Sequence, residues 1–305
     1  MSAKFKIIPF VLLASVLVIT CKKQESAHSN ESINSGSATI LVDETLTPII
    51  EDQVQIFENK HGAKITLESK SEAEAIQKLV NDTSQIAILT RKLHPNEEQL
   101  FENKKIIPKI TKIATDAIAL ISNKRSKDTV VDLQDVIAFM RQQPSKIKGL
   151  VFDNPNSSTA RYINELAGVK KFPEKDVFSF KTNDELIKYI SENDGIIGVV
   201  GINWINNPQP QMRTYIENIN VLSVKGISSN SYTFPSQNNI AEGIYPLARD
   251  LYVVNCQGYA GLGMGFASFI TSEIGQRIML KAGLVPVNTP GRRLHIRNDL
   301  ENNQK

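Results

Sequence analysis

Residues 38–50 read ATILVDETLTPII, a β-rich run that passes through a polar turn into a helical pattern. Thr47 offers an N-cap, and Pro48 suits the first turn of a helix. Apolar side chains then recur at helical spacing up to Gly62, namely Ile50, Val54 and Phe57. The stretch therefore predicts a strand and a helix joined by a polar loop.

The same order repeats directly afterwards. Residues 65–67 predict a second strand, and Ser71 with Glu74 forms a capping-box pattern that opens the next helix. Residues 85–89 predict a third strand, and Pro95 begins a polar helix. This order predicts an α/β fold with a mostly parallel sheet, in which ligands bind beyond the carboxyl ends of the strands.

A second series follows the extended apolar stretch at 106–122. It predicts helices at 133–140, 158–166 and 182–192 and strands at 149–152 and 196–200. Residues 225–243 are rich in turn formers and are predicted to be irregular, whereas 251–255 predict a strand. Apolar spacing predicts one helix from Phe266 to Ala282. Two such series predict two lobes.

Composition narrows the function classes. The 305 residues are 41% hydrophobic, enough to build cores. The balance of 35 basic and 32 acidic residues argues against a dedicated nucleic-acid binder, which needs a basic surplus. Two cysteines exclude a disulfide scaffold and an all-cysteine zinc site.

The N-terminus is typical of an exported protein. Residues 1–20 combine a basic start with an uncharged apolar run that is too short to span a bilayer. Cys21 follows directly, which resembles a bacterial lipoprotein signal and predicts a lipidated Cys21. An ordinary signal peptide with a chance cysteine is the alternative. Residues 21–37 predict a flexible tether, and Cys256 is then expected to be a buried or semi-buried thiol.

The strongest local signal for ligand binding is residues 151–161, VFDNPNSSTAR. A buried strand leads into a polar turn and a helix start that carries the hydroxyls of Ser157, Ser158 and Thr159. Hydroxyl donors, free N–H groups and the positive helix end together suit an anion, and Arg161 can add a charged contact. Plain helix capping is the alternative interpretation.

Other strand ends carry polar groups in the same topological position. Thr45 follows the first strand, Ser69 the second, and Thr90 and Arg91 the third. Each alone fits a solvated loop, but several that converge on one cleft predict an oxyanion site.

Enzymatic signals are weak. The sequence has no metalloprotease, P-loop or nucleophile-elbow motif, and none of its four histidines has a local acid or nucleophile partner. We therefore expect no enzyme activity, no cofactor and no metal site.

Six segments in matching order carry a family resemblance. They are 85–93 (QIAILTRKL), 116–121 (DAIALI), 156–159 (NSST), 195–200 (GIIGVV), 245–252 (YPLARDLY) and the GQRI and GLVP pair within 275–286. The chain resembles the type II periplasmic solute-binding proteins, and within them the phosphate-binding components of phosphate ABC transporters. The resemblance covers residues 39–287.

The resemblance implies a two-lobed periplasmic-binding-protein fold. Each lobe would be a mostly parallel sheet flanked by helices, and two hinge strands, at 116–122 and 249–255, would join them. The predicted division is a signal peptide at 1–20, the lipidated cysteine and tether at 21–37, lobe one at 38–117 and 250–294, lobe two at 118–249, and a polar tail at 295–305.

The resemblance also implies an extracytoplasmic protein of the periplasm or cell envelope that binds phosphate between its lobes and delivers it to an inner-membrane ABC permease. Together with the signal at Cys21, it predicts a lipid-anchored protein, and we expect a monomer. The predicted ligand residues are Thr45, Ser69, Thr90, Arg91, Ser157, Ser158, Thr159 and Arg161.

The sequence departs from the family pattern at the site. Ser158 replaces a glycine, Asp153 stands where an arginine is frequent, and the acceptor of the phosphate proton stays open among Asp43, Glu44 and Asp153. The alternatives are another oxyanion, a small organic anion, or a sensor or interaction lipoprotein without a transport role.

Overall fold

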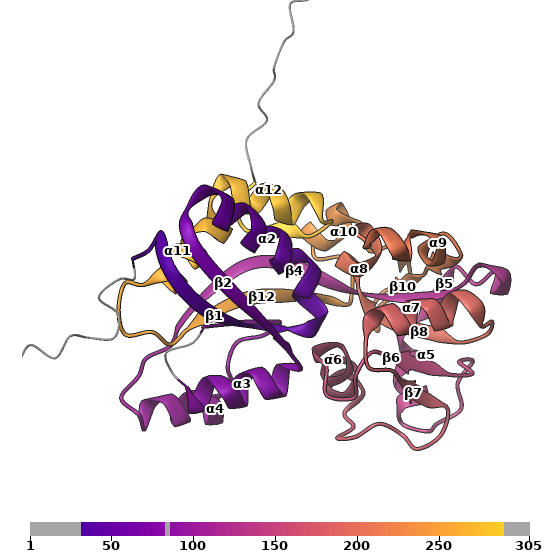
Figure 1. The fold of residues 1–305 in the computed structure, drawn as a ribbon. Helices are drawn as coiled ribbons and strands as arrows, with labels where there is room; N and C mark the ends of the chain where they lie inside the picture. Colours follow the sequence, from indigo (N-terminus) through magenta and orange to yellow (C-terminus); the bar gives the residue numbers. More distant parts are fainter. Residues whose placement is uncertain (1–31, 83–85, 290–305) are drawn as a thin grey trace, which may run out of the picture. The chain divides into compact units, whose positions relative to one another are not determined.

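The computed structural model describes residues 32–82 and 86–289, and the chain from Ser32 onward forms one compact unit (Figure 1). The predicted signal peptide, Cys21, most of the tether and the polar tail lie outside the described residues. Within the described ranges, no helix is long and apolar enough to cross a membrane.

Three parallel strands build the first part of the sheet. β1 (Ser35–Asp43) lies between β2 (Gly62–Lys70) and β3 (Ile86–Leu89). Along β1, Ile40 and Val42 pack in one hydrophobic cluster, and Leu41 between them packs in another, because successive strand residues face opposite sides.

Helices cover both faces of this part of the sheet, as Figure 1 shows. One face carries α2 (Thr47–Lys60), α11 (Leu262–Thr271) and α12 (Glu273–Lys281). The other carries α3 (Glu72–Asn81) and α4 (Pro95–Glu102). These elements make up lobe one.

Lobe two has its own parallel strands, β6 (Leu150–Phe152), β7 (Val177–Ser179) and β8 (Ile197–Gly201). Its longer helices are α5 (Leu133–Met140), α6 (Ser158–Ala167) and α7 (Asn183–Glu192). The remaining helices are the short α8 (Ile202–Asn206), α9 (Arg213–Ile216) and α10 (Gln237–Ala241). The short strands of lobe two are β5 (Val130–Asp132), β9 (Ile219–Val221), β10 (Ser223–Lys225) and β11 (Tyr232–Thr233). Another short strand, β13 (Val285–Pro286), belongs to the second segment of the predicted lobe one.

Two antiparallel strands connect the lobes. The long strand β4 (Lys109–Asn123) pairs with β12 (Ala248–Asn255) as far as Ala117 and with β8 from Ile118 onward. The chain therefore leaves lobe one through β4 and returns to it through β12, as expected for hinge strands.

The buried side chains divide in the same way. One cluster draws on residues 117–247, and two others draw on residues 40–114 and 251–284. The predicted two-lobed α/β fold is confirmed. The strands β2, β1 and β3 of lobe one and β8, β6 and β7 of lobe two run parallel, whereas the hinge strands β4 and β12 run antiparallel to their neighbours. The predicted lobe boundaries stay predictions.

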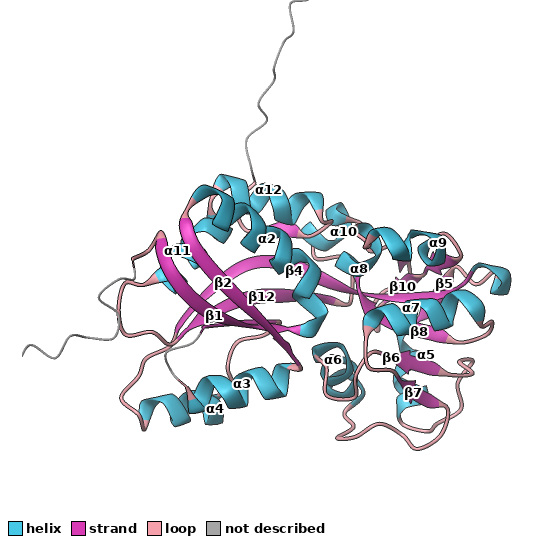
Figure 2. Cartoon of the chain, viewed as in Figure 1, coloured by secondary structure: helices cyan, strands magenta, loops and turns pink. Residues whose placement is uncertain are grey.

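Most predicted elements are present (Figure 2). The Ser71–Glu74 capping box forms with both reciprocal bonds, and α5 begins and ends where its apolar pattern predicts. Cys256 is buried, 3% exposed, and burial raises the pKa of its thiol to about 12. This agrees with an inert core thiol rather than a reactive one.

Three local predictions were wrong. The predicted helix at 266–282 is two helices, because Ser272 is extended and its hydroxyl accepts the Gly275 N–H, which starts α12. The segment 225–243 is not wholly irregular, since it contains β11 and α10. Thr47 is the first residue of α2 rather than its N-cap, which is Leu46.

Candidate functional site

Polar side chains of the two lobes meet at the carboxyl ends of β1, β3 and β6. Lobe one contributes the turn Glu44–Leu46, the residues after β3 and the start of α3. Lobe two contributes the loop after β6 and the start of α6. A cavity of about 440 Å³ opens at this junction, and Glu72, Arg91, Ser157 and Arg161 are among its lining residues. The topology thus brings the site to the strand ends predicted for this sheet.

Thr45 of lobe one and Ser158 of lobe two are in direct hydroxyl contact. Their hydroxyl oxygens lie 3.1 Å apart, and both side chains are fully buried. The Thr45 hydroxyl donates to Asp43 Oδ1 at 2.7 Å, so the Ser158 hydroxyl is the donor in the contact between them. Asn203 and Trp204 of lobe two also hold the Thr45 carbonyl, at 3.1 and 2.8 Å.

Arg249 joins this pair to the hinge. It donates from Nη1 to the Ser158 hydroxyl at 2.9 Å and from Nη2 to the Thr45 hydroxyl at 3.1 Å. Its Nε donates to Asp116 Oδ2 at 3.0 Å. Burial raises the pKa of the Asp116 carboxyl, and the Arg249 guanidinium opposes that shift. A buried ion pair on the two hinge strands therefore fixes a guanidinium against both lobes.

The start of α6 is organised by Asp153 at the end of β6. Asp153 Oδ1 accepts the hydroxyls of Ser157 at 2.6 Å and Thr159 at 2.9 Å, and Oδ2 accepts the Asn183 amide at 3.1 Å. The Ser157 hydroxyl in turn accepts the Ala160 N–H and caps the helix. These hydroxyls point back to their own loop because a buried carboxylate holds them.

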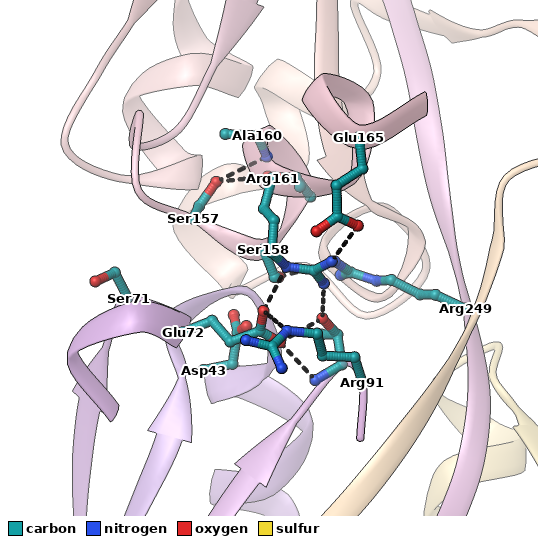
Figure 3. Close-up of polar contacts among 12 residues, drawn as sticks. Asp43, Ser71, Glu72, Arg91, Ser157, Ser158, Ala160, Arg161, Glu165 and Arg249 are labelled. Atoms are coloured by element: carbon teal, nitrogen blue, oxygen red, sulfur yellow. Dashed lines mark hydrogen bonds and ion pairs between the residues drawn. The ribbon is translucent and has the colours of Figure 1, made fainter. Parts of the chain in front are cut away.

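Glu72, the first residue of α3, lies between the two lobes (Figure 3). Its Oε1 accepts the Thr90 N–H at 3.1 Å and the Thr90 hydroxyl at 2.8 Å. Its Oε2 accepts Arg91 Nε at 3.2 Å and Arg161 Nε at 2.5 Å. Glu72 is 1% exposed, so this carboxylate is removed from water and its four donors replace the lost hydration.

Two further carboxyls lie beside Thr45 and hold their protons more tightly than usual. Burial and the Glu72 charge raise the pKa of Asp43 to about 6. Burial, followed by the charges of Asp153 and Asp43, raises the pKa of Glu44 to about 7. The local negative charge therefore changes within the neutral pH range.

The arginines of the site already have acidic partners. Arg91 makes two bonds to Glu97, at 2.7 and 2.8 Å, in addition to its bond to Glu72. Arg161 binds Glu165 as well as Glu72. An incoming anion must therefore compete with internal carboxylates for these donors.

The structure brings most of the predicted residues together. Thr45, Thr90, Ser158 and Arg161 belong to the contacts between the lobes, and Ser157 and Thr159 lie directly beside them. Arg91 contacts the same Glu72 carboxylate. Ser69 is set apart, because its hydroxyl bonds to Thr47 at 2.8 Å in an exposed pair. The ligand-binding roles of all eight residues stay predictions.

Sequence reasoning missed Glu72 and the Arg249–Asp116 pair as site residues. Glu72 follows a helix N-cap, where an acidic residue is common because it favours the helix dipole. Arg249 and Asp116 were assigned to hinge strands. A charged residue within an otherwise apolar strand was the available signal, since a buried charge needs a partner.

The site offers hydroxyl, backbone and guanidinium donors, which suit an oxyanion. Among the described residues, no group of three or more His, Cys, Asp or Glu side chains could hold a metal ion.

Comparisons with known proteins agree with the fold. The family model described as the PBP superfamily domain matches residues 27–273. The chain belongs to this superfamily. Among curated proteins, the phosphate-binding protein PstS of Staphylococcus haemolyticus is 24% identical over 266 residues, covering 80% of this chain and 79% of that protein.

Two solved structures show the same fold at low identity. A substrate-binding protein from Clostridium perfringens with bound phosphate has a TM-score of 0.65 and 20% identity, covering 83% of this chain and 100% of that one. An ABC-type phosphate transport receptor from Vibrio cholerae has a TM-score of 0.63 and 15% identity, covering 82% and 100%.

Proposed function

We propose that this protein is an extracytoplasmic solute-binding protein that captures inorganic phosphate between its two lobes and delivers it to an ABC permease. The curated relative is a phosphate-binding protein, and the two similar structures are of a substrate-binding protein with bound phosphate and a phosphate transport receptor, which supports a binding role rather than an enzymatic one. Closure about β4 and β12 would enclose the anion, and the permease would recognise the closed state.

One observation carries the proposal. Donors from both lobes meet in two contacts, Thr45 with Ser158 and Thr90 with Arg161. A ligand that binds both sides favours the closed state by its differential affinity for that state.

The second candidate is another anion in the same fold. The acidic partners of Arg91 and Arg161 favour it, because less positive charge is left for a dianion than the arginine count suggests. A small carboxylate, which carries one negative charge, is therefore favoured among the competing ligands over sulfate and molybdate, which are dianions.

Calorimetry of the dialysed full chain tests the proposal. We expect heat with phosphate and much weaker heat with sulfate, and Arg161→Ala should weaken phosphate binding at least tenfold. Arg213→Ala, an exposed arginine of the same lobe, is the matched control and should bind as the wild type does. Absence of heat with phosphate in the wild type would contradict the proposal.

Membrane attachment through a lipid on Cys21 belongs to the same proposal, and so does a monomeric state. Cys21→Ser should move the protein from the membrane fraction to the soluble fraction, while Cys256→Ser should leave it with the membrane. Equal partition of Cys21→Ser and wild type would reject the anchor. A dimer mass by light scattering would reject the monomer.

A further inference from the structure

The Glu72 carboxylate has the surroundings expected of a bound oxyanion rather than of a surface glutamate. Both of its oxygens accept two donors each, from the backbone and hydroxyl of Thr90 and from the Nε atoms of Arg91 and Arg161. The positive end of α3 adds a favourable potential at this first-turn position. Backbone N–H, hydroxyl and guanidinium donors are also the groups that bind phosphate oxygens.

This carboxylate also links the lobes. Thr90 and Arg91 follow β3 in lobe one, whereas Arg161 is on α6 in lobe two. The Arg161 guanidinium bonds to Glu72 through Nε at 2.5 Å and to the Thr90 hydroxyl through Nη2 at 3.2 Å. Glu72 therefore makes bonds to both lobes at once, which is what a captured solute does.

We propose that Glu72 is an internal ligand. Its carboxylate occupies the anion subsite, holds the lobes together before a solute arrives, and leaves when the solute binds. The competition with phosphate rests on the proposed function, whereas the closure by Glu72 does not.

Displacement follows from charge and geometry. Two anions cannot share the same Thr90 and Arg161 donors, because their repulsion in a buried site is strong. The solute must therefore take these donors over, and Glu72 must turn into the adjoining cavity, of which it is a lining residue. The measured association constant for the solute is then the intrinsic constant multiplied by the fraction of protein in which Glu72 has left the subsite. Such a protein would need a correspondingly higher concentration of solute for saturation.

Small-angle X-ray scattering of the anion-free full chain tests closure. We expect the wild type to be compact and to change little with phosphate. Glu72→Ala should have a larger radius of gyration without phosphate, and Glu72→Gln should lie between them. Glu165→Gln is the matched control, because it removes the other carboxylate on Arg161 within α6 and should stay compact. A compact Glu72→Ala protein would overturn the closure by Glu72.

Calorimetry of the same variants tests competition, and thermal melting confirms that each is folded. Glu72→Ala should bind phosphate about tenfold more tightly than the wild type, because the internal competitor is gone. Equal or weaker binding would overturn the proposal, since Glu72 would then be a bystander or a ligand residue. If neither protein binds phosphate but Glu72→Ala still opens, the proposed function fails and the internal ligand stands.

Discussion

At the edge of lobe two the buried Asp153 carboxylate turns back to its own loop, whereas at the edge of lobe one the buried Glu72 carboxylate reaches across to the other lobe. Both lie next to a serine-capped helix start, α6 and α3. Asp153 accepts Ser157 and Thr159, which are within six residues of it. Glu72 accepts Arg161, which is 89 residues away.

The difference separates two uses of the same chemical group. A carboxylate bound within its loop orients nearby hydroxyls and can stay in place when a ligand arrives. A carboxylate bound across the lobes competes with the ligand for the same donors. Variants of Asp153 should therefore change the order of its own loop, whereas variants of Glu72 should change the closure of the two lobes.

The largest effect is expected at Arg249, which contacts both edges. Arg249→Met leaves Asp116 buried without its partner, so unfolding free energy should fall by about 3 kcal/mol, and anion binding should be lost. Urea unfolding and calorimetry measure these effects. The double variant Asp116→Asn/Arg249→Met should recover part of the stability but not the binding. Recovery of both would show that the guanidinium has no role at the site.

Asp153→Asn breaks the order at the edge of lobe two. The hydroxyls of Ser157 and Thr159 lose a charged acceptor, so unfolding free energy should fall by about 2 kcal/mol and phosphate binding should weaken. The scattering of the anion-free protein should not change, because Asp153 does not link the lobes through these bonds. Asp194→Asn, an exposed carboxylate of the same lobe, is the control for stability. An expanded Asp153→Asn protein would erase the distinction between the two edges.

How much of this comparison the sequence predicts depends on the range of the interactions. Helix starts are local: Ser71 and Ser157 cap through the N–H groups of residues three positions later, so their patterns are readable. The partners of Glu72 and Arg249 are far away in the chain, and no local pattern selects them. The break at Ser272 was missed because apolar spacing continues across it, although the extended backbone of this one residue ends α11 and begins α12.

Glu44, another carboxyl at the edge of lobe one, should make the unfolding free energy depend on pH. Its pKa is raised from 4.5 to about 7, so the folded protein binds a proton that the unfolded chain has lost. Its destabilising effect is absent below pH 4.5, grows as the pH rises towards 7, and is constant above that. Because the side chain is partly exposed, Glu44→Gln should stabilise the fold by only about 1 kcal/mol at pH 8.

Urea unfolding at pH 4.5, 6 and 8 measures the effect of Glu44→Gln. Glu98→Gln, an exposed glutamate of α4, is the matched control and should show no trend. A stability difference that does not vary with pH would mean that the Glu44 carboxyl titrates normally.

The smallest effect is expected at Ser69. Its hydroxyl bonds to Thr47 in an exposed pair rather than to the groups between the lobes. Ser69→Ala should change phosphate affinity less than about twofold and leave the unfolding free energy within about 0.5 kcal/mol. Ser158→Ala, which removes a hydroxyl between Thr45 and Arg249, should weaken binding several-fold in the same titration. A larger effect at Ser69 would extend the site along the edge of lobe one.

A crystal structure of the protein grown with phosphate tests the central claim most directly. We predict a phosphate that accepts bonds from Thr90 and Arg161, with the Glu72 side chain turned away from both. A structure at saturating phosphate in which Glu72 still binds Arg161, and the phosphate lies elsewhere, would contradict it.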